Sequence, residues 1–241
     1  DGFRTSHEYQ KIEVMDMEEL RPLVNQKALA EFRSRAMSPE RPVARGMAEN
    51  PETFFAHREA SNKYYREIPG IVEKYMQAVS KITGRKYDLF SYYGAEDAEQ
   101  LIICMGSVTE AAREAIDHLM QEGRKVGMIS VHLFRPFSTK HLLAAVPKTV
   151  KRIAVLDRTK ESGAGGEPLY LDVKEAFYNH EDRPMIVGGR YGLGSADTTP
   201  TMIISVYDNL SLPEPKNHFS LGIVDDVTFE SLPLEKEQAL G

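Results

Sequence analysis

The opening segment FRTSHE, residues 3–8, carries the densest group of potentially reactive side chains in this 241-residue sequence. Ser6 precedes His7, but neighbours in sequence do not by themselves place a hydroxyl on an imidazole, and hydrolase triads are assembled from distant segments. A triad is therefore disfavoured. The better hypothesis is that Arg4 and His7 border a ligand that is held mainly by other polypeptide.

The glycine-rich segment TKESGAGGEP, residues 159–168, follows a predicted strand and leads into a predicted helix. Open α/β sheets bind ligands at the carboxyl ends of their strands, and glycines let the backbone approach an anion. Lys160 is the candidate cation for a phosphate group, such as those of coenzyme A, whereas Glu161 and Glu167 add negative charge that opposes it. The sequence favours an interface loop and leaves an anion site as the alternative.

A second segment, GGRYGLGSADTTP at residues 188–200, has the same arrangement. Arg190 is its candidate partner for an anion or for coenzyme A, and Thr198 or Thr199 is the expected N-cap of the next helix. The favoured interpretation is again a glycine-rich turn that packs against a neighbouring element. Anion binding stays open as the alternative.

Several other kinds of site are disfavoured by spacing. Gly106 stands alone between a predicted strand and a helix capped by Ser107, whereas a dinucleotide fingerprint needs several glycines. The seven histidines show no metal-ligand spacing, and His132 is expected to be a hydrogen-bonded core residue of a strand. Asp225 and Asp226 are expected at a solvated strand end rather than at a metal ion. We therefore predict no metal site in this chain.

Composition argues against further classes of protein. The 41% hydrophobic content is sufficient for a packed core, and no apolar run reaches the roughly 20 residues that a membrane helix requires. The formal net charge is −6 and there is no basic stripe, which argues against binding to nucleic acid. The single cysteine, Cys104, cannot form an intrachain disulfide or hold an iron–sulfur cluster within this chain. We expect a cytoplasmic protein.

Hydrophobic patterning predicts the elements that position these residues. It predicts a helix at 52–68 that is covered on several sides, and a helix that starts at Pro69 and stops at Gly84. From Leu101 onward, strands alternate with helices, which predicts a doubly wound, mostly parallel α/β sheet. The strands are predicted at 101–105, 126–134, 152–157, 185–189 and 218–227, and helices are predicted to begin near Ser107, Ser138, Pro168 and Pro200.

Whole segments of the sequence resemble those of one family. They are, in chain order, DGFRTSHE, VARGMAENPETFFAHREASNKYY, GRKYDLFSYYGAEDAE, MGSVTEAA, LFRPFS, VLDRTKESGAGGEPLYLDV, GGRYGLGSADTTP and LGIVDDVTFESL. This combination is similar to the pyruvate:ferredoxin (flavodoxin) oxidoreductase family. The resemblance implies that residues 1–86 are the end of a thiamine-pyrimidine domain with a helical connector. It implies that residues 87–234 are a domain like the C-terminal domain of transketolase, followed by a tail at 235–241.

The resemblance also implies an activity for a full-length protein. That activity is the oxidative decarboxylation of pyruvate to acetyl-CoA and CO2, with thiamine diphosphate, Mg2+ and [4Fe-4S] clusters as cofactors. Ferredoxin or flavodoxin would accept the electrons, coenzyme A would accept the acetyl group, and the full-length enzyme would be a homodimer. We expect this chain to be an internal piece that binds the remaining domains of the same enzyme. It is expected to hold no cofactor, metal or catalytic residue of its own and to be inactive alone.

Two alternatives stay open from the sequence. One is an enzyme of the same class that acts on another 2-oxoacid. The other is a free-standing α/β module that binds coenzyme A or another phosphate ligand through Lys160 or Arg190.

Overall fold

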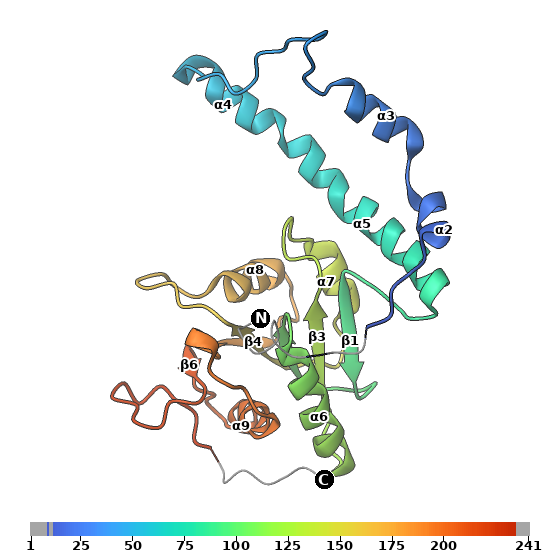
Figure 1. Cartoon of the computed structure of the whole chain (residues 1–241). Helices are drawn as coiled ribbons and strands as arrows, with labels where there is room; N and C mark the ends of the chain where they lie inside the picture. The colour runs from blue at the N-terminus through green and yellow to red at the C-terminus, as the bar shows by residue number, and fades with distance from the viewer. Residues whose placement is uncertain (1–8, 10–11, 235–241) are drawn as a thin grey trace. The chain divides into compact units, whose positions relative to one another are not determined.

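A computed structural model of the chain describes Tyr9 and residues 12–234 (Figure 1). The chain divides into two compact units: one spans Gln10–Asp88, and the other contains Tyr9 together with the residues from Leu89 onward. The first is largely helical and the second contains a sheet. Each is described by itself.

The second unit is built on a six-stranded sheet with the order β1-β3-β2-β4-β5-β6. Every neighbouring pair is parallel except β1 and β3, which are antiparallel, so the predicted mostly parallel α/β sheet is confirmed. All six residues of β3 are buried, as expected for a strand whose two faces are both covered. The strands are β1 Phe90–Gly94, β2 Gln100–Cys104, β3 Val126–Val131, β4 Arg152–Asp157, β5 Met185–Arg190 and β6 Phe219–Ser220.

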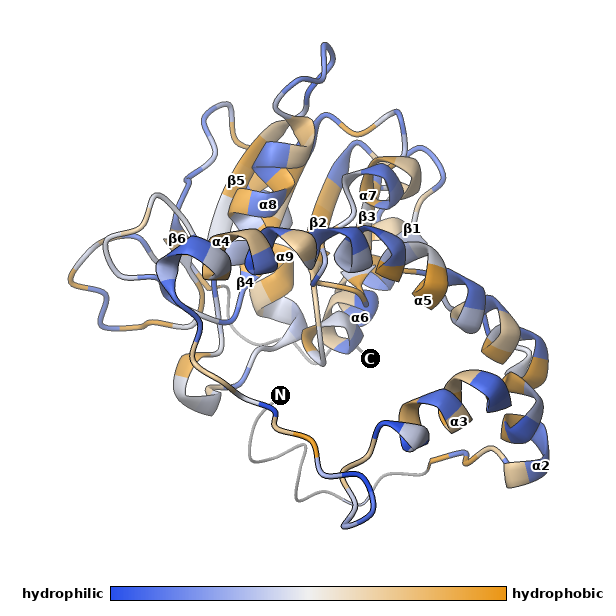
Figure 2. Ribbon diagram, turned by 90° about the horizontal axis from the view of Figure 1, so that it is seen from above, coloured by the Kyte–Doolittle hydropathy of each residue, from blue (hydrophilic) through white to orange (hydrophobic). Residues whose placement is uncertain are grey.

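Four helices cover the two faces of the sheet (Figure 2). Helices α6 (Val108–Gln121) and α9 (Pro200–Ser211) contact each other and share one face, where the main hydrophobic core lies. Helices α7 (Thr139–Ala145) and α8 (Pro168–Phe177) lie on the other face, against β1, β4 and β5. A short 3-10 turn, η2 (Leu193–Ser195), follows β5.

The expected helix caps are confirmed only in part. The Thr199 hydroxyl accepts a hydrogen bond from the Met202 N–H at 3.4 Å, as an N-cap should. Ser107 instead has helical backbone angles and makes no capping hydrogen bond to α6. Ser138 also does not cap α7, because its hydroxyl lies 2.6 Å from Nδ1 of His141.

Two predicted strands end earlier than the sequence indicated. Strand β3 stops at Val131, so the prediction that His132 is a core residue is wrong, and this side chain is exposed beyond the strand end. Strand β6 stops at Ser220 instead of continuing to residue 227. Gly222 follows with a φ of +82°, a left-handed conformation that breaks an extended chain.

The first unit consists of short helices and one long one. They are α2 Met17–Leu20, the 3-10 helix η1 Arg21–Leu23, α3 Gln26–Ser34, α4 Pro51–Ala60 and α5 Asn62–Thr83. Pro69 lies inside α5, so the prediction that it starts a helix is wrong. The predicted stop at Gly84 is confirmed, because this residue has a φ of +70° and its N–H donates to Ser80 O at 2.9 Å.

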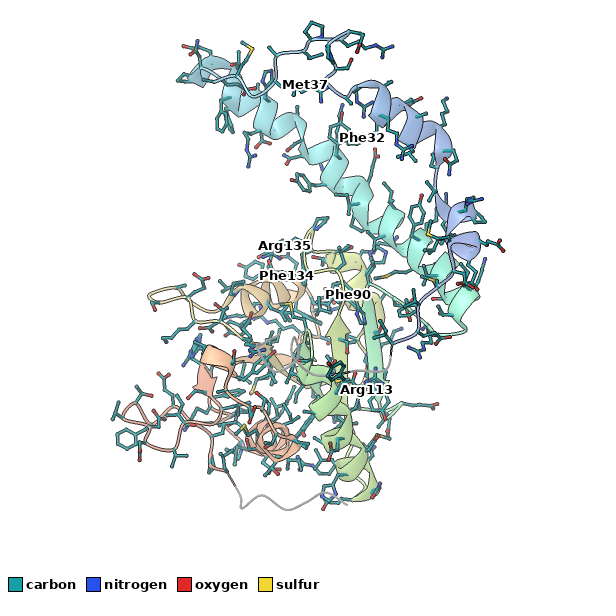
Figure 3. All side chains as sticks on the ribbon, in the orientation of Figure 1. Phe32, Met37, Phe90, Arg113, Phe134 and Arg135 are labelled. Atoms are coloured by element: carbon teal, nitrogen blue, oxygen red, sulfur yellow. The ribbon has the colours of Figure 1, made fainter. Side chains whose placement is uncertain are left out.

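The helical unit buries very little of its surface. Among the described residues up to Asp88, only Pro69 is buried, and large apolar side chains such as Phe32 and Met37 are exposed (Figure 3). The prediction that the helix beginning near residue 52 is covered on several sides is also wrong, since Phe54 and Phe55 of α4 are exposed. The apolar content of this unit therefore does not form a core of its own.

Candidate functional site

The candidate site lies where β4 and β5 end side by side. In the parallel register of these strands, Asp157 is opposite Arg190, so a carboxylate and a guanidinium share the carboxyl edge of the sheet. The two glycine-rich segments follow directly, one leading to α8 and the other through η2 to α9. This edge is where open α/β sheets bind ligands.

The Asp157 side chain, at the end of β4, binds the N-terminus of α8. One carboxylate oxygen accepts a hydrogen bond from the Leu169 N–H and the other from the Tyr170 N–H, both at 3.0 Å. These are first-turn amides that the helix itself cannot satisfy, and they are the groups that would otherwise bind an anionic ligand. Burial raises the pKa of Asp157, while these two hydrogen bonds act in the opposite direction. The protein's own carboxylate therefore fills the anion position at this helix.

Arg190 is buried among groups that accept its hydrogen bonds. Its Nη1 lies 3.5 Å from Oε1 of Glu167, and its Nη2 donates to His218 O at 2.7 Å and to the Glu230 carboxylate. Glu167 is also buried, and its other oxygen, Oε2, is a buried atom without a hydrogen-bond partner. The guanidinium thus lies between two carboxylates, and it ties β5 to the start of α8 and to residue 230.

Two glycines at this edge allow close packing of aromatic rings. A Cβ on Gly166 would overlap the ring of Tyr170, and a Cβ on Gly189 would overlap the ring of Phe219. By contrast, Gly165 has no heavy atom within 4 Å of the position that its Cβ would take. Gly166 and Gly189 are therefore packed against aromatic rings, in keeping with the interpretation of these segments as packed turns. The backbone around Gly165, by contrast, has free space beside it.

A shallow depression of about 530 Å³ lies between the two loops. Lys160 is exposed and lines it, together with Arg158, whose Nε donates to Gly192 O at 2.9 Å. Arg190 is not among the lining residues, so the structure does not bring the two candidate cations into one pocket. The lining consists of Arg158, Thr159, Lys160, Gly192, Leu193, Gly194 and Ser195.

The remaining candidates lie elsewhere or outside the described residues. Arg4 and His7 are both outside the residues that the structure describes. Asp226 is partly exposed, and hydrogen bonds from Thr228 and Ser231 lower its pKa to about 2. Over the described part of the chain, no cluster of three potential metal ligands from His, Cys, Asp and Glu is found.

The sequence did not identify Asp157 and Glu230, which bind the first-turn amides of α8 and the Arg190 guanidinium at this edge of the sheet. The pattern places Asp157 only at the end of the strand predicted at 152–157, and nothing in the sequence distinguishes Glu230. The signal for Asp157 was its position, because a carboxylate at the end of a strand can reach the amides of the helix that follows. Glu230 had no such signal, since 40 residues separate it from Arg190.

Two family models match the chain. Residues 98–203 match a model described as pyruvate:ferredoxin oxidoreductase core domain II, and residues 1–77 match one described as pyruvate flavodoxin/ferredoxin oxidoreductase, thiamine diP-bdg. The chain belongs to the pyruvate:ferredoxin (flavodoxin) oxidoreductase family. The two matches fall in both units of the structure.

Members of the pyruvate:ferredoxin (flavodoxin) oxidoreductase family are similar to this chain over nearly its whole length. A pyruvate-flavodoxin oxidoreductase of Klebsiella pneumoniae is 59% identical over 97% of the chain. A pyruvate:ferredoxin oxidoreductase of Moorella thermoacetica is 52% identical over 98% of it. The chain spans about a fifth of the length of these relatives, 20% of each.

A solved structure with a similar chain is that of a 2-oxoglutarate:ferredoxin oxidoreductase from Magnetococcus marinus, with 2-oxoglutarate, coenzyme A and succinyl-CoA bound. It is 20% identical, with a TM-score of 0.42, and the match covers 71% of this chain and 28% of that one. No helix of the described residues has the length and apolar character needed to cross a membrane.

The described residues present no assembled set of ligands for a diphosphate and its divalent cation. A diphosphate held through a divalent cation needs oxygen ligands for the metal and free donors for the phosphates. The described residues offer no metal-ligand cluster, and the first-turn amides of α8 are taken by Asp157. Cys104 is fully buried, and burial raises the pKa of its thiol to about 12. No step of the chemistry is therefore assigned to these side chains.

Proposed function

We propose that this chain is part of a thiamine diphosphate-dependent 2-oxoacid oxidoreductase. The reaction converts pyruvate and coenzyme A into acetyl-CoA and CO2 and passes two electrons to ferredoxin or flavodoxin. The observation that carries the proposal is the 59% identity, over 97% of the chain, to a pyruvate-flavodoxin oxidoreductase. Identity at this level across both units favours the same role within a larger enzyme.

Within that enzyme, the chain is proposed to be structural. Residues 87–234 form a domain like the C-terminal domain of transketolase, residues 1–86 are the end of a thiamine-pyrimidine domain with its connector, and 235–241 are a tail. The closed arrangement around Asp157 and Arg190 supports this role, because its charged groups bind one another instead of pointing at an open cavity. Arg4 and His7 are the proposed substrate-side residues.

The cofactors and partners of the proposed enzyme lie mostly beyond this chain. Thiamine diphosphate, Mg2+ and the [4Fe-4S] clusters would be held by other polypeptide of the same enzyme. The proposed assembly is a cytoplasmic homodimer that exchanges electrons with ferredoxin or flavodoxin. Fractionation of the source cells and the molar mass of the purified enzyme test these two points.

A comparison of two proteins tests the proposed reaction. The full-length protein and the 241-residue chain are each assayed with pyruvate, thiamine diphosphate, Mg2+, coenzyme A and an electron acceptor. We expect CO2 release and reduction of the acceptor with the full-length protein only. Activity of the chain alone would refute the structural role, and inactivity of the full-length protein on pyruvate, with turnover of another 2-oxoacid, would change the substrate.

The second candidate function is a module that binds coenzyme A or another phosphate ligand. The observation that favours it is the depression that Lys160 and Arg158 line. Calorimetry with coenzyme A on wild type and on Lys160→Ala tests it, because Lys160 is exposed and its replacement is expected to leave the fold intact. Arg190→Ala needs a parallel measurement of folding, since it leaves Glu167 buried without its partner. Tight binding that is lost in Lys160→Ala would favour the module.

A further inference from the structure

An exposed apolar loop projects from the β6 edge of the sheet. We call residues Gly222–Phe229 the β6 loop, which leaves the sheet after β6 and returns to it at Glu230. Three of its side chains are almost fully exposed: Val224 at 87%, Val227 at 88% and Phe229 at 84%. Scattered apolar residues are common on protein surfaces, but three within six residues concentrate exposed apolar surface on one loop, which we call the patch.

The two ends of the β6 loop are anchored in the sheet. Leu221 and Leu232 are buried on either side of it. The Ser220 N–H donates to Glu230 O at 3.2 Å, and the Leu232 N–H donates to Ser220 O at 2.9 Å. The returning chain therefore adds to the edge of the sheet next to β6.

Side chains fix the end of the loop further. Arg190 holds the Glu230 carboxylate, and the Lys216 ammonium donates to Phe229 O at 2.9 Å and to Ser231 O at 3.2 Å. Within the loop, Asp226 accepts hydrogen bonds from the N–H and the hydroxyl of Thr228, at 3.0 and 2.6 Å. The patch is thus presented by a backbone that is tied at many points, which lowers the entropy lost when it binds.

Phe229 has an unfavourable backbone conformation. Its φ is +60°, a left-handed conformation that is uncommon for a bulky residue, and the exposed ring recovers little burial in return. The surrounding hydrogen bonds enforce this geometry. Enforced strain of this kind is concentrated at functional positions.

We propose that the β6 loop is a docking element for another part of the full-length protein, which receives Val224, Val227 and Phe229 in an apolar socket with a basic rim. This inference rests on the proposed function in one respect, namely that a longer protein exists. Polypeptide for such a socket is available, because the chain spans only 20% of the length of its relatives.

Charge argues for this occupant over a second copy of the same loop. Residues 222–231 carry three carboxylates, at Asp225, Asp226 and Glu230, and no basic side chain. A symmetric contact of the loop with itself would bring like charges together, which is unfavourable. A basic rim on a different surface would instead complement the exposed Asp225.

Thiol labelling measures whether the loop is covered. Val227→Cys is introduced into both the full-length protein and the 241-residue chain, and Lys148→Cys, an exposed position between α7 and β4, is the matched control. Alkylation is followed by mass spectrometry of the peptide that contains each site, and Cys104 does not interfere because it is buried. We expect residue 227 to react at least about tenfold more slowly in the full-length protein, in keeping with a desolvated interface core, and residue 148 to react equally in both.

Equal labelling of residue 227 in the two proteins would overturn the proposal. Protection of residue 227 in the 241-residue chain alone, with a molar mass twice that of one chain in sedimentation, would also overturn it in favour of a second copy. Either result could be obtained with a full-length protein that is active on pyruvate, so failure of this inference is distinguishable from failure of the proposed function.

A second variant separates the effect of the Phe229 backbone strain from the effect of the Phe229 ring on docking. In the 241-residue chain, Phe229→Gly should raise the melting temperature by about 2–4 °C, because glycine adopts a positive φ without penalty. In the full-length protein that carries Val227→Cys, the added Phe229→Gly change should restore fast labelling of residue 227 by removing the aromatic contact. A full-length protein in which Phe229→Gly leaves residue 227 protected would show that the ring does not occupy a socket.

Discussion

The Asp157 carboxylate determines whether the N-terminus of α8 can bind an anionic ligand. Its two oxygens satisfy the amides of Leu169 and Tyr170, so the start of α8 is closed to exogenous anions. The Arg190 guanidinium is likewise bound by the Glu167 and Glu230 carboxylates, which leaves it unavailable to an added anion. Both charged groups therefore hold elements together, and the open part of this edge is limited to the depression that Lys160 lines.

Removal of the Asp157 side chain should destabilise the folded chain. In Asp157→Ala, two buried N–H groups lose their acceptor, which should lower the free energy of unfolding by about 3 kcal/mol and the melting temperature by about 6–12 °C. Urea unfolding of the 241-residue chain measures this loss. Asp182→Ala, at an exposed aspartate in the turn before β5, is the control and should change stability by less than about 0.5 kcal/mol. Equal stabilities would contradict the role given to Asp157.

The strands and helices of the second unit follow closely from local patterning, and the exceptions have physical causes. The parallel strands were predictable because their residues are almost continuously apolar, as burial on both faces requires. Strand β1 was missed because FSYYG is a partly polar edge strand, mostly half-buried. Helix α5 was predicted to begin at Pro69 because proline is favoured in the first turn, but the helix begins at Asn62 and continues through Pro69, although proline cannot donate a helical hydrogen bond.

The glycines of the two loops differ in what they permit. Gly189→Ala would place a methyl group inside the ring of Phe219, so we expect a loss of about 1–3 kcal/mol in the free energy of unfolding. Gly165→Ala meets no neighbouring atom and should be neutral or slightly stabilising, by up to about 1 kcal/mol. Chemical denaturation of both variants provides the comparison. Similar losses in the two would show that the loop tip is packed as tightly as the strand.

The two units differ in how much of their stability they can supply themselves. The sheet unit has a core between its strands and helices, whereas the described residues up to Asp88 bury only Pro69. Ordering a residue costs about 1–2 kcal/mol of conformational entropy, which burial normally offsets. The helical unit lacks that compensation within its own residues.

Limited proteolysis of the 241-residue chain should therefore cut the helical unit first. We expect a protected product that begins close to Leu89, because the boundary between the units lies there. Mass spectrometry of the products identifies the cleavage sites. If α5 persists as long as the sheet at matched protease concentration, the helical unit is more stable than its burial suggests.

The candidate site was less predictable than the fold, for a reason that concerns the whole chain. Lys160 and Arg190 were selected by type and by position after a strand, and their environment depends on segments that lie far away in sequence. The partners of Arg190 come from three places, residues 167, 218 and 230, which only the folded chain brings together. Arg4 and His7 lie outside the described residues, so their role stays a prediction.

The clamp between Asp157 and the first turn of α8 has a consequence for how this loop can vary. Because the Asp157 carboxylate binds the helix directly and Glu167 binds Arg190, the position of strand and helix does not depend on the open part of the loop around Gly165. Doubling the length of such a connection costs only about 0.6 kcal/mol in closure entropy. The segment around Gly165 is therefore a natural insertion point, where a tag or a reporter peptide could be spliced in while strand and helix keep their register.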